Sequence, residues 1–311
     1  MSLGPAPLTV LWRDEHLVAV YKPAGWLVHR TGLDAGETRF VMQTLRDQLG
    51  QHVFPVHRLD KGTCGVLVMA LHADAARALS QAFEHHQTHK HYLALVRGWA
   101  PLASDVDHAL RPDDAPPDAP VQPARTRFAR LATLALAPAE GQPPADPRYP
   151  SSRLSLVQAW PETGRRHQIR RHLKHLAHPI IGDATHGKGP LNRWWAEQLG
   201  QQRLWLHAAT LSLPHPVHGG LLQIHSGLCQ PGGLAAAAPT EAAADGLASA
   251  WAEGGATASV PAQPGLFRAD PQPPNAPADL HDWQALLQRW PWQPDRDTSG
   301  TSPIPDQRAR R

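Results

Sequence analysis

The chain has 311 residues, enough to bury a sizeable core in one large domain or two smaller ones. It contains only two cysteines, no N-terminal segment of the signal-peptide type, and no apolar run near the roughly 18–20 residues that a membrane span needs. We therefore expect a cytoplasmic protein without a disulfide framework or a membrane partner.

The net charge of +3 is unevenly distributed along the chain. Residues 1–230 contain 24 Lys and Arg against 18 Asp and Glu, whereas residues 231–311 contain 6 against 9. An excess of this size is common in proteins that do not bind nucleic acid, so it does not decide the partner. It places any basic surface within residues 1–230.

The predicted elements of residues 1–230 alternate between strands and helices. Asp74 is the expected N-cap of a helix with one apolar stripe. A second helix follows the turn at residues 163–164. There is no regular βαβ cadence and no Gly-rich phosphate loop, so we predict an α+β fold with a mixed, mostly antiparallel sheet flanked by helices and loops. Apolar runs predict the strands at 17–21, 66–71, 92–96, 126–136, 154–159 and 205–213.

The composition changes at about residue 230. From there to about residue 280 the chain is rich in Ala, Pro and Gly, which cannot bury enough apolar surface to offset chain entropy. We therefore predict one folded domain at 1–230 and a disordered tail at 231–311, with room for one short helix near 282–290. Deleting this tail is expected to leave the domain folded. Two proline-rich stretches, 112–123 and 138–150, are predicted surface loops.

A carboxylate beside a predicted strand is the first candidate for chemistry. Asp60 lies between Arg58 and Lys61, in a polar loop that leads into an apolar run. Opposite charges within about 4–6 Å favour the ionised carboxylate, which suits a nucleophile or a base. A structural ion pair beside a turn explains the same charge pattern.

A basic segment is the second candidate. Residues 164–179 contain no acidic residue, and an apolar face at Ile169, Leu173 and Leu176 leaves the cations for the rest of the helix surface. Such a strip suits phosphates, although a solvated basic face is an equal alternative. The cations are Arg165, Arg166, Arg170, Arg171 and Lys174.

Metal and thiol chemistry have weaker support. The 20 histidines include clusters, but no HExxH pattern or cysteine pair accompanies them, and we predict no metal site. Cys64 as a nucleophile with His57 as its base lacks any partner motif. Tyr92 opens an apolar run, and by pattern alone it is a strand residue of the core.

Taken in order, four stretches resemble the RluA-type family of pseudouridine synthases over roughly residues 10–225. The family usually has Ser where Cys64 stands. The resemblance implies isomerisation of uridine to pseudouridine in structured RNA without a cofactor. The stretches are YKPAGWLVH at 21–29, HRLDKGTCG at 57–65, HYLALVRG at 91–98 and TGRRHQIRRHLKHLAHPIIGDATHG at 163–187.

The resemblance also implies roles for single residues. Asp60 matches the catalytic carboxylate, Tyr92 the aromatic residue that stacks on the uracil, and Arg170 the arginine that pairs with the carboxylate. Arg58 matches the arginine thought to occupy the space of the extruded base. The remaining expected substrate-binding residues are Lys61, Arg165, Arg166, Arg171 and Lys174.

The stretch at 163–187 indicates which RNA is the target. With Asn192 and Arg193 it most resembles the branch that modifies tRNA at position 65, in the acceptor-side stem. Ribosomal RNA is the alternative target, and a non-catalytic RNA-binding or folding protein is the alternative function. A carboxylate-based hydrolase would need a second acid near Asp60, which no motif supplies. We expect a monomer without an obligate protein partner.

Overall fold

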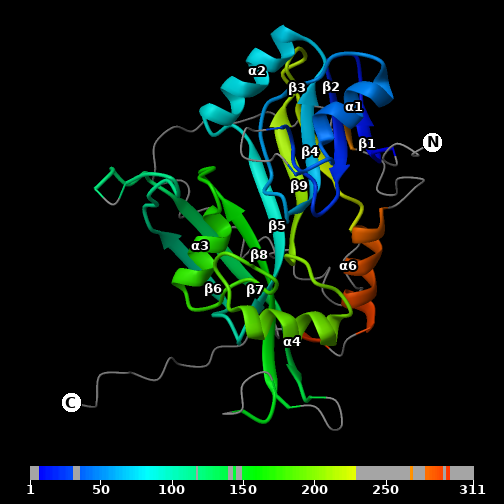
Figure 1. The fold of residues 1–311 in the computed structure, drawn as a ribbon. Helices are drawn as coiled ribbons and strands as arrows, with labels where there is room; N and C mark the ends of the chain where they lie inside the picture. Colours follow the sequence, from blue (N-terminus) through cyan, green and yellow to red (C-terminus); the bar gives the residue numbers. More distant parts are fainter. Residues whose placement is uncertain are drawn as a thin grey trace.

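One mixed sheet organises the chain (Figure 1). The structure is a computed structural model that describes residues 7–30, 36–116, 118–138, 143–144, 149–228, 267–268, 277–289 and 292–294. The helices are α1 Val41–Leu49, α2 Ala73–Glu84, α3 Gln168–His175, α4 Gly189–Leu199 and α6 Ala278–Arg289. The strands are β1 Val10–Arg13, β2 Leu17–Lys22, β3 Phe54–Pro55, β4 Cys64–Ala70, β5 His89–Arg97, β6 Ala103–Asp107, β7 Arg125–Leu136, β8 Ser152–Pro161, β9 Leu206–Pro214, β10 Leu221–His225, β11 Phe267–Arg268 and β12 Gln293–Pro294.

The strand order confirms the predicted α+β class. The main path runs β1-β2-β4-β9-β5-β8-β7-β12, with β3 beside β4, β6 beside β7, and β10 between β9 and β11. Among the named strands of the described residues, β4–β9 and β10–β11 are the parallel pairs. The predicted strands correspond to β2, β4, β5, β7, β8 and β9.

Two helices cover opposite faces of the central strands. Leu93 and Leu95 of β5 pack in the same cluster as α6, whereas Ala94 and Val96 pack with α3. Successive side chains of a strand point to opposite faces, so α3 and α6 lie on either side of the sheet (Figure 1). We call the α3 side the front face and the α6 side the back face. Tyr92 packs with the α3 cluster, on the front face.

A close approach of β4 and β9 sets the end of the loop that carries Asp60. Gly65 pairs with Ala208 and has a φ of +111°. A Cβ at this position would lie 2.2 Å from the carbonyl oxygen of Ala208. Only glycine fits both the backbone conformation and this spacing, so the GTCG sequence fixes where the loop ends and β4 begins.

The N-cap of helix α2 differs from expectation. The N-cap of α2 is His72, whose Nδ1 accepts the Ala75 N–H at 3.3 Å, and not Asp74. Asp74 lies in the first turn, where its charge is favourable beside the unpaired N–H groups. In α3, Ile169 and Leu173 are buried, as the apolar spacing predicted.

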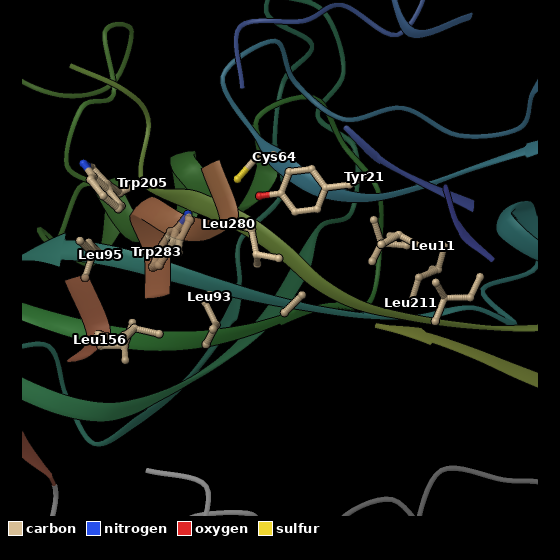
Figure 2. Packing of buried hydrophobic residues seen from close by; sticks show 14 of the residues in the cluster. Leu11, Tyr21, Cys64, Leu93, Leu95, Leu156, Trp205, Leu211, Leu280 and Trp283 are labelled. Carbon is tan, nitrogen blue, oxygen red and sulfur yellow. The ribbon is translucent and has the colours of Figure 1, made fainter. Parts of the chain in front are cut away.

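The C-terminal segment contributes a helix to the core. Leu280, Trp283, Leu286 and Leu287 of α6 are buried in the back-face cluster. Figure 2 shows Trp283 beside Trp205 and Leu280 near Tyr21. The helix considered near 282–290 therefore begins earlier, at Ala278, and packs on the sheet. The rest of the tail at 231–311, apart from β11 and β12, falls outside the described residues, as does most of the predicted loop at 138–150.

Candidate active site

Asp60 and Arg170 meet on the front face although they are far apart in sequence. Asp60 lies in the loop between β3 and β4, and Arg170 lies in the first turn of α3. Arg170 Nη1 donates to Asp60 Oδ2 at 3.1 Å. The Asp60 side chain is 20% exposed, whereas that of Arg170 is 8% exposed. The carboxylate therefore combines a buried cationic partner with access for a substrate.

A second carboxylate orients Arg170. Asp183 accepts from Arg170 Nε and Nη2, both at 2.7 Å, and also from the backbone N–H groups of Thr185 and His186. Burial raises the pKa of Asp183, but Arg170 and the His186 N–H outweigh it and hold the pKa below its ordinary value. This bidentate pair leaves Nη1 of Arg170 for Asp60. Motif analysis missed Asp183, although it lies within the fourth stretch.

Tyr92 completes the group that the resemblance implied. Burial, together with the charge of Asp60, raises the pKa of Tyr92 well above its ordinary value. The phenol therefore stays protonated near neutral pH, and its ring lies on the front face close to the loop that carries Asp60. The structure thus brings Asp60, Tyr92 and Arg170 together from three separate elements.

Lys22 supports the loop and was not identified from sequence. Its ammonium is completely buried and donates to the carbonyls of Pro23, Lys61 and Thr63 at 3.0, 3.1 and 2.7 Å. Burial lowers the pKa of Lys22 to about 7, yet three carbonyl acceptors match the three N–H donors of the charged form. We assign the ammonium form, which ties the Asp60 loop to the end of β2.

The cations that flank Asp60 in sequence are directed elsewhere. The Lys61 ammonium pairs with Glu37, and Arg58 is exposed. The expectation that these two neighbours hold the carboxylate is therefore not met, because the partner of Asp60 is Arg170. Both residues are exposed.

The basic strip on and before α3 is partly covered by the loop between β6 and β7. Arg165 donates to the Pro123 carbonyl at 3.0 Å. Arg166 pairs with Asp113 and Asp114, and Arg171 donates to Asp113 at 3.2 Å. Lys174 is exposed. Residues 164–179 contain no acidic residue themselves, but a loop that is distant in sequence supplies the counterions Asp113 and Asp114.

His167 links this loop to the carboxylate. It adopts a left-handed conformation with φ of 56°, immediately before α3. Its Nδ1 lies 2.9 Å from Asp113 Oδ2 and its Nε2 lies 3.9 Å from Asp60 Oδ2. Burial lowers the pKa of His167, despite an opposing contribution from Asp60. The ring is thus a neighbour of the site to which the sequence analysis gave no role.

The alternative of a Cys64 nucleophile with His57 as its base finds no support in the geometry. Cys64 is fully buried, and the imidazole beside its thiol is His207, with Sγ to Nδ1 at 3.2 Å. His57 Nε2 instead accepts the Val68 N–H at 2.9 Å. Among the described residues, no group of three or more His, Cys, Asp or Glu is placed to hold a metal ion. No helix in the described part of the chain is long and apolar enough to cross a membrane.

Similar structures define the class of protein. Human RNA Pseudouridylate Synthase Domain Containing 1 superimposes with a TM-score of 0.55 at 25% identity, covering 72% of this chain and 85% of that one. Human RNA Pseudouridylate Synthase Domain Containing 4 gives a TM-score of 0.52 at 26% identity, covering 73% and 90%. The fold is therefore that of a pseudouridine synthase.

Sequence comparison identifies the family. The family described as RNA pseudouridylate synthase matches residues 16–175. A protein named tRNA pseudouridine synthase C from Yersinia pestis is 50% identical over 224 residues, covering 70% of this chain and 85% of the relative. Its namesake from Vibrio cholerae is 46% identical over 228 residues, covering 71% and 91%. The chain belongs to the RNA pseudouridylate synthase family, and it isomerises uridine to pseudouridine in RNA, as the resemblance predicted.

Proposed function

We propose that the RNA substrate is tRNA and that the target uridine lies at position 65, in the acceptor-side stem. The support for tRNA is the identity of 46–50% to several proteins named tRNA pseudouridine synthase C. The support for the position is the resemblance of residues 163–187 to the branch that modifies this site. We also propose that the enzyme works as a monomer in the cytoplasm, which light scattering and cell fractionation would test.

We further propose that Asp60 is the catalytic carboxylate, and its geometry carries this assignment. The reaction breaks the N1–C1′ bond of uridine, turns the uracil and joins C5 to C1′, so no atom is gained or lost. A partly exposed carboxylate with a buried arginine beside it suits this chemistry, because Arg170 keeps the negative charge in place without covering it. Tyr92 would stack on the uracil and handle a proton.

The basic residues around the site would bind the RNA backbone. The target uridine must leave its stack, which costs roughly a few kcal/mol. Phosphate contacts from the exposed Arg58 and Lys174, and from Lys61 once it leaves Glu37, offset this cost. Arg165, Arg166 and Arg171 would join them once phosphates replace their present partners in the loop at 111–123.

The alternatives predict different outcomes for one experiment. Purified protein is incubated with tRNA and ribosomal RNA transcribed without modification, and pseudouridine is mapped by carbodiimide labelling and primer extension. A single new stop at position 65 of tRNA is expected. A stop only in ribosomal RNA would keep the chemistry and overturn the tRNA assignment. Tight RNA binding with no stop would favour a non-catalytic RNA-binding protein.

Substitution of Asp60 tests its role directly. Asp60→Asn should abolish isomerisation while the Kd for tRNA stays within about threefold of the wild-type value, because the phosphate contacts are untouched. Asp47→Asn, which breaks an exposed ion pair with Arg46 on α1, is the matched control and should be fully active. A turnover number near the wild-type value for Asp60→Asn would exclude this carboxylate from the chemistry.

A further inference from the structure

A polar cluster on the back face joins helix α6 to the catalytic loop. Arg203 Nη1 donates to Asp279 Oδ1 at 2.6 Å, and Arg203 Nη2 lies 2.9 Å from Cys64 Sγ. The other oxygen of Asp279 accepts the Ala24 N–H at 2.7 Å. The side chains of Arg203 and Asp279 are only 6% and 17% exposed. Asp279 therefore uses both of its oxygens inside the protein.

These contacts involve two places that hold the Asp60 loop: Cys64 at its end and Ala24 in the turn after β2. Cys64 ends the loop that carries Asp60 and begins β4. Ala24 lies in the turn after β2, where the next residue, Gly25, donates its N–H to the Lys61 carbonyl at 2.8 Å. Lys22, from the same segment, also donates to Lys61 and Thr63. The loop at 59–64 is thus held by residues 22–25 and by Arg203, and Asp279 contacts both Ala24 and Arg203.

We propose that Asp279 is a positioning residue for the isomerisation: through Arg203 and Ala24, helix α6 holds the loop at 59–64 so that Asp60 faces Arg170. This inference rests on Asp60 being the catalytic carboxylate. Helix α6 lies outside the family match at residues 16–175 and covers the back face, whereas Arg170 approaches from the front. Asp279 therefore affects Asp60 indirectly, from the back face of the sheet.

The charge of Asp279 matters as well as its packing. Arg203 is buried close to a second buried cation, Lys22, and both lie within electrostatic reach of Asp279. A buried guanidinium that loses its carboxylate is strongly destabilised where it stands. In Asp279→Asn we expect it to turn toward Asp282, which is 3.4 Å from Nη1, and to release Cys64. The loop would then lose one of its two attachments.

The test separates positioning from stability. For Asp279→Asn we expect kcat on tRNA to fall about ten- to a hundredfold, with KM within about twofold of wild type, because a displacement of about 1 Å at a reacting group costs this much. Asp279→Glu keeps the carboxylate and should recover most of kcat. Assays are run well below the melting temperature of each variant, so that unfolding does not contribute.

Leu286→Ala is the control on the same helix. It removes a buried apolar contact without touching the charged cluster, so it should lower the melting temperature and leave kcat unchanged. If Asp279→Asn does not fold, Arg203→Lys takes its place, since a lysine cannot bridge carboxylate and thiol, and the same loss of kcat is expected. Wild-type kcat in these charge variants, or an equal loss of kcat in Leu286→Ala, would overturn the proposal. An inactive wild-type enzyme would instead overturn the proposed function.

Discussion

The front and back faces of the sheet each hold an arginine–aspartate pair, but the two pairs are built differently. On the front face, Asp183 takes two N–H groups of Arg170 at 2.7 Å, and Asp60 receives a third at 3.1 Å. On the back face, Asp279 uses one oxygen for Arg203 and the other for a backbone N–H. The same residue types therefore have different roles. Asp60 stays accessible to a substrate because Asp183 binds Arg170, whereas both oxygens of Asp279 are bound by Arg203 and the Ala24 backbone.

The largest effect is expected when the back face loses its helix. A chain ending after Leu228 lacks α6, which exposes apolar surface that Leu280, Trp283, Leu286 and Leu287 otherwise cover. Each such side chain contributes roughly 1.5–3 kcal/mol on burial, so we expect the melting temperature to fall by about 10 °C or more. Calorimetry of the two chains measures this. An unchanged melting temperature would mean that α6 adds no stability to the domain. The tail would then behave as its composition predicts.

Substitution of Asp183 disrupts the ion pairs of Arg170 on the front face most directly. Asp183→Asn leaves the buried guanidinium of Arg170 with Asp60 as its remaining carboxylate, and we expect a loss of about 3–5 kcal/mol in the free energy of unfolding. Activity should fall too, since Arg170 would turn toward Asp60 and cover it. Urea unfolding and kcat on tRNA measure the two effects. Asp114→Asn, which removes an exposed carboxylate, is the control and should keep the wild-type stability.

Acid should weaken the front-face pair in a defined direction. The pKa of Asp183 is lowered in the folded chain, so the folded state binds this proton only at a lower pH than the unfolded state does. The stability that the pair contributes is therefore fully present above about pH 5 and is lost as the pH falls further. Melting temperatures measured from about pH 6 to pH 3 should fall less steeply for Asp183→Asn than for the wild type. Parallel curves would show that another group governs the acid transition.

The smallest effects are expected at the exposed cations. Lys174→Ala should weaken tRNA binding and reduce the slope of log Kd against log salt by about one. Arg166→Ala should have less effect, because Arg166 already pairs with Asp113 and Asp114 and must release them to bind phosphate. Filter binding across a range of salt concentrations compares the two. A larger effect at Arg166 than at Lys174 would mean that Asp113 and Asp114 do not compete with RNA for Arg166.

The sequence by itself determined the class of fold and much of the chemistry. Apolar runs located β2, β4, β5, β7, β8 and β9, because burial of a strand leaves a local signature in the residues that form it. The motifs around Asp60, Tyr92 and Arg170 identified the family, and the structure gathers these three residues at one site. The spacing of Ile169 and Leu173 likewise predicted the buried side of α3.

Only the tertiary structure decided which charges meet. The neighbours of Asp60 in sequence are Arg58 and Lys61, yet its partner lies 110 residues away. Because their partners are also distant in sequence, sequence reasoning missed or gave no role to Asp113, Asp183 and the helix at Ala278–Arg289. Periodicity and composition describe how a segment meets solvent or core, whereas a buried charge pair depends on two segments arriving at the same place, and that is settled by the packing of the whole sheet.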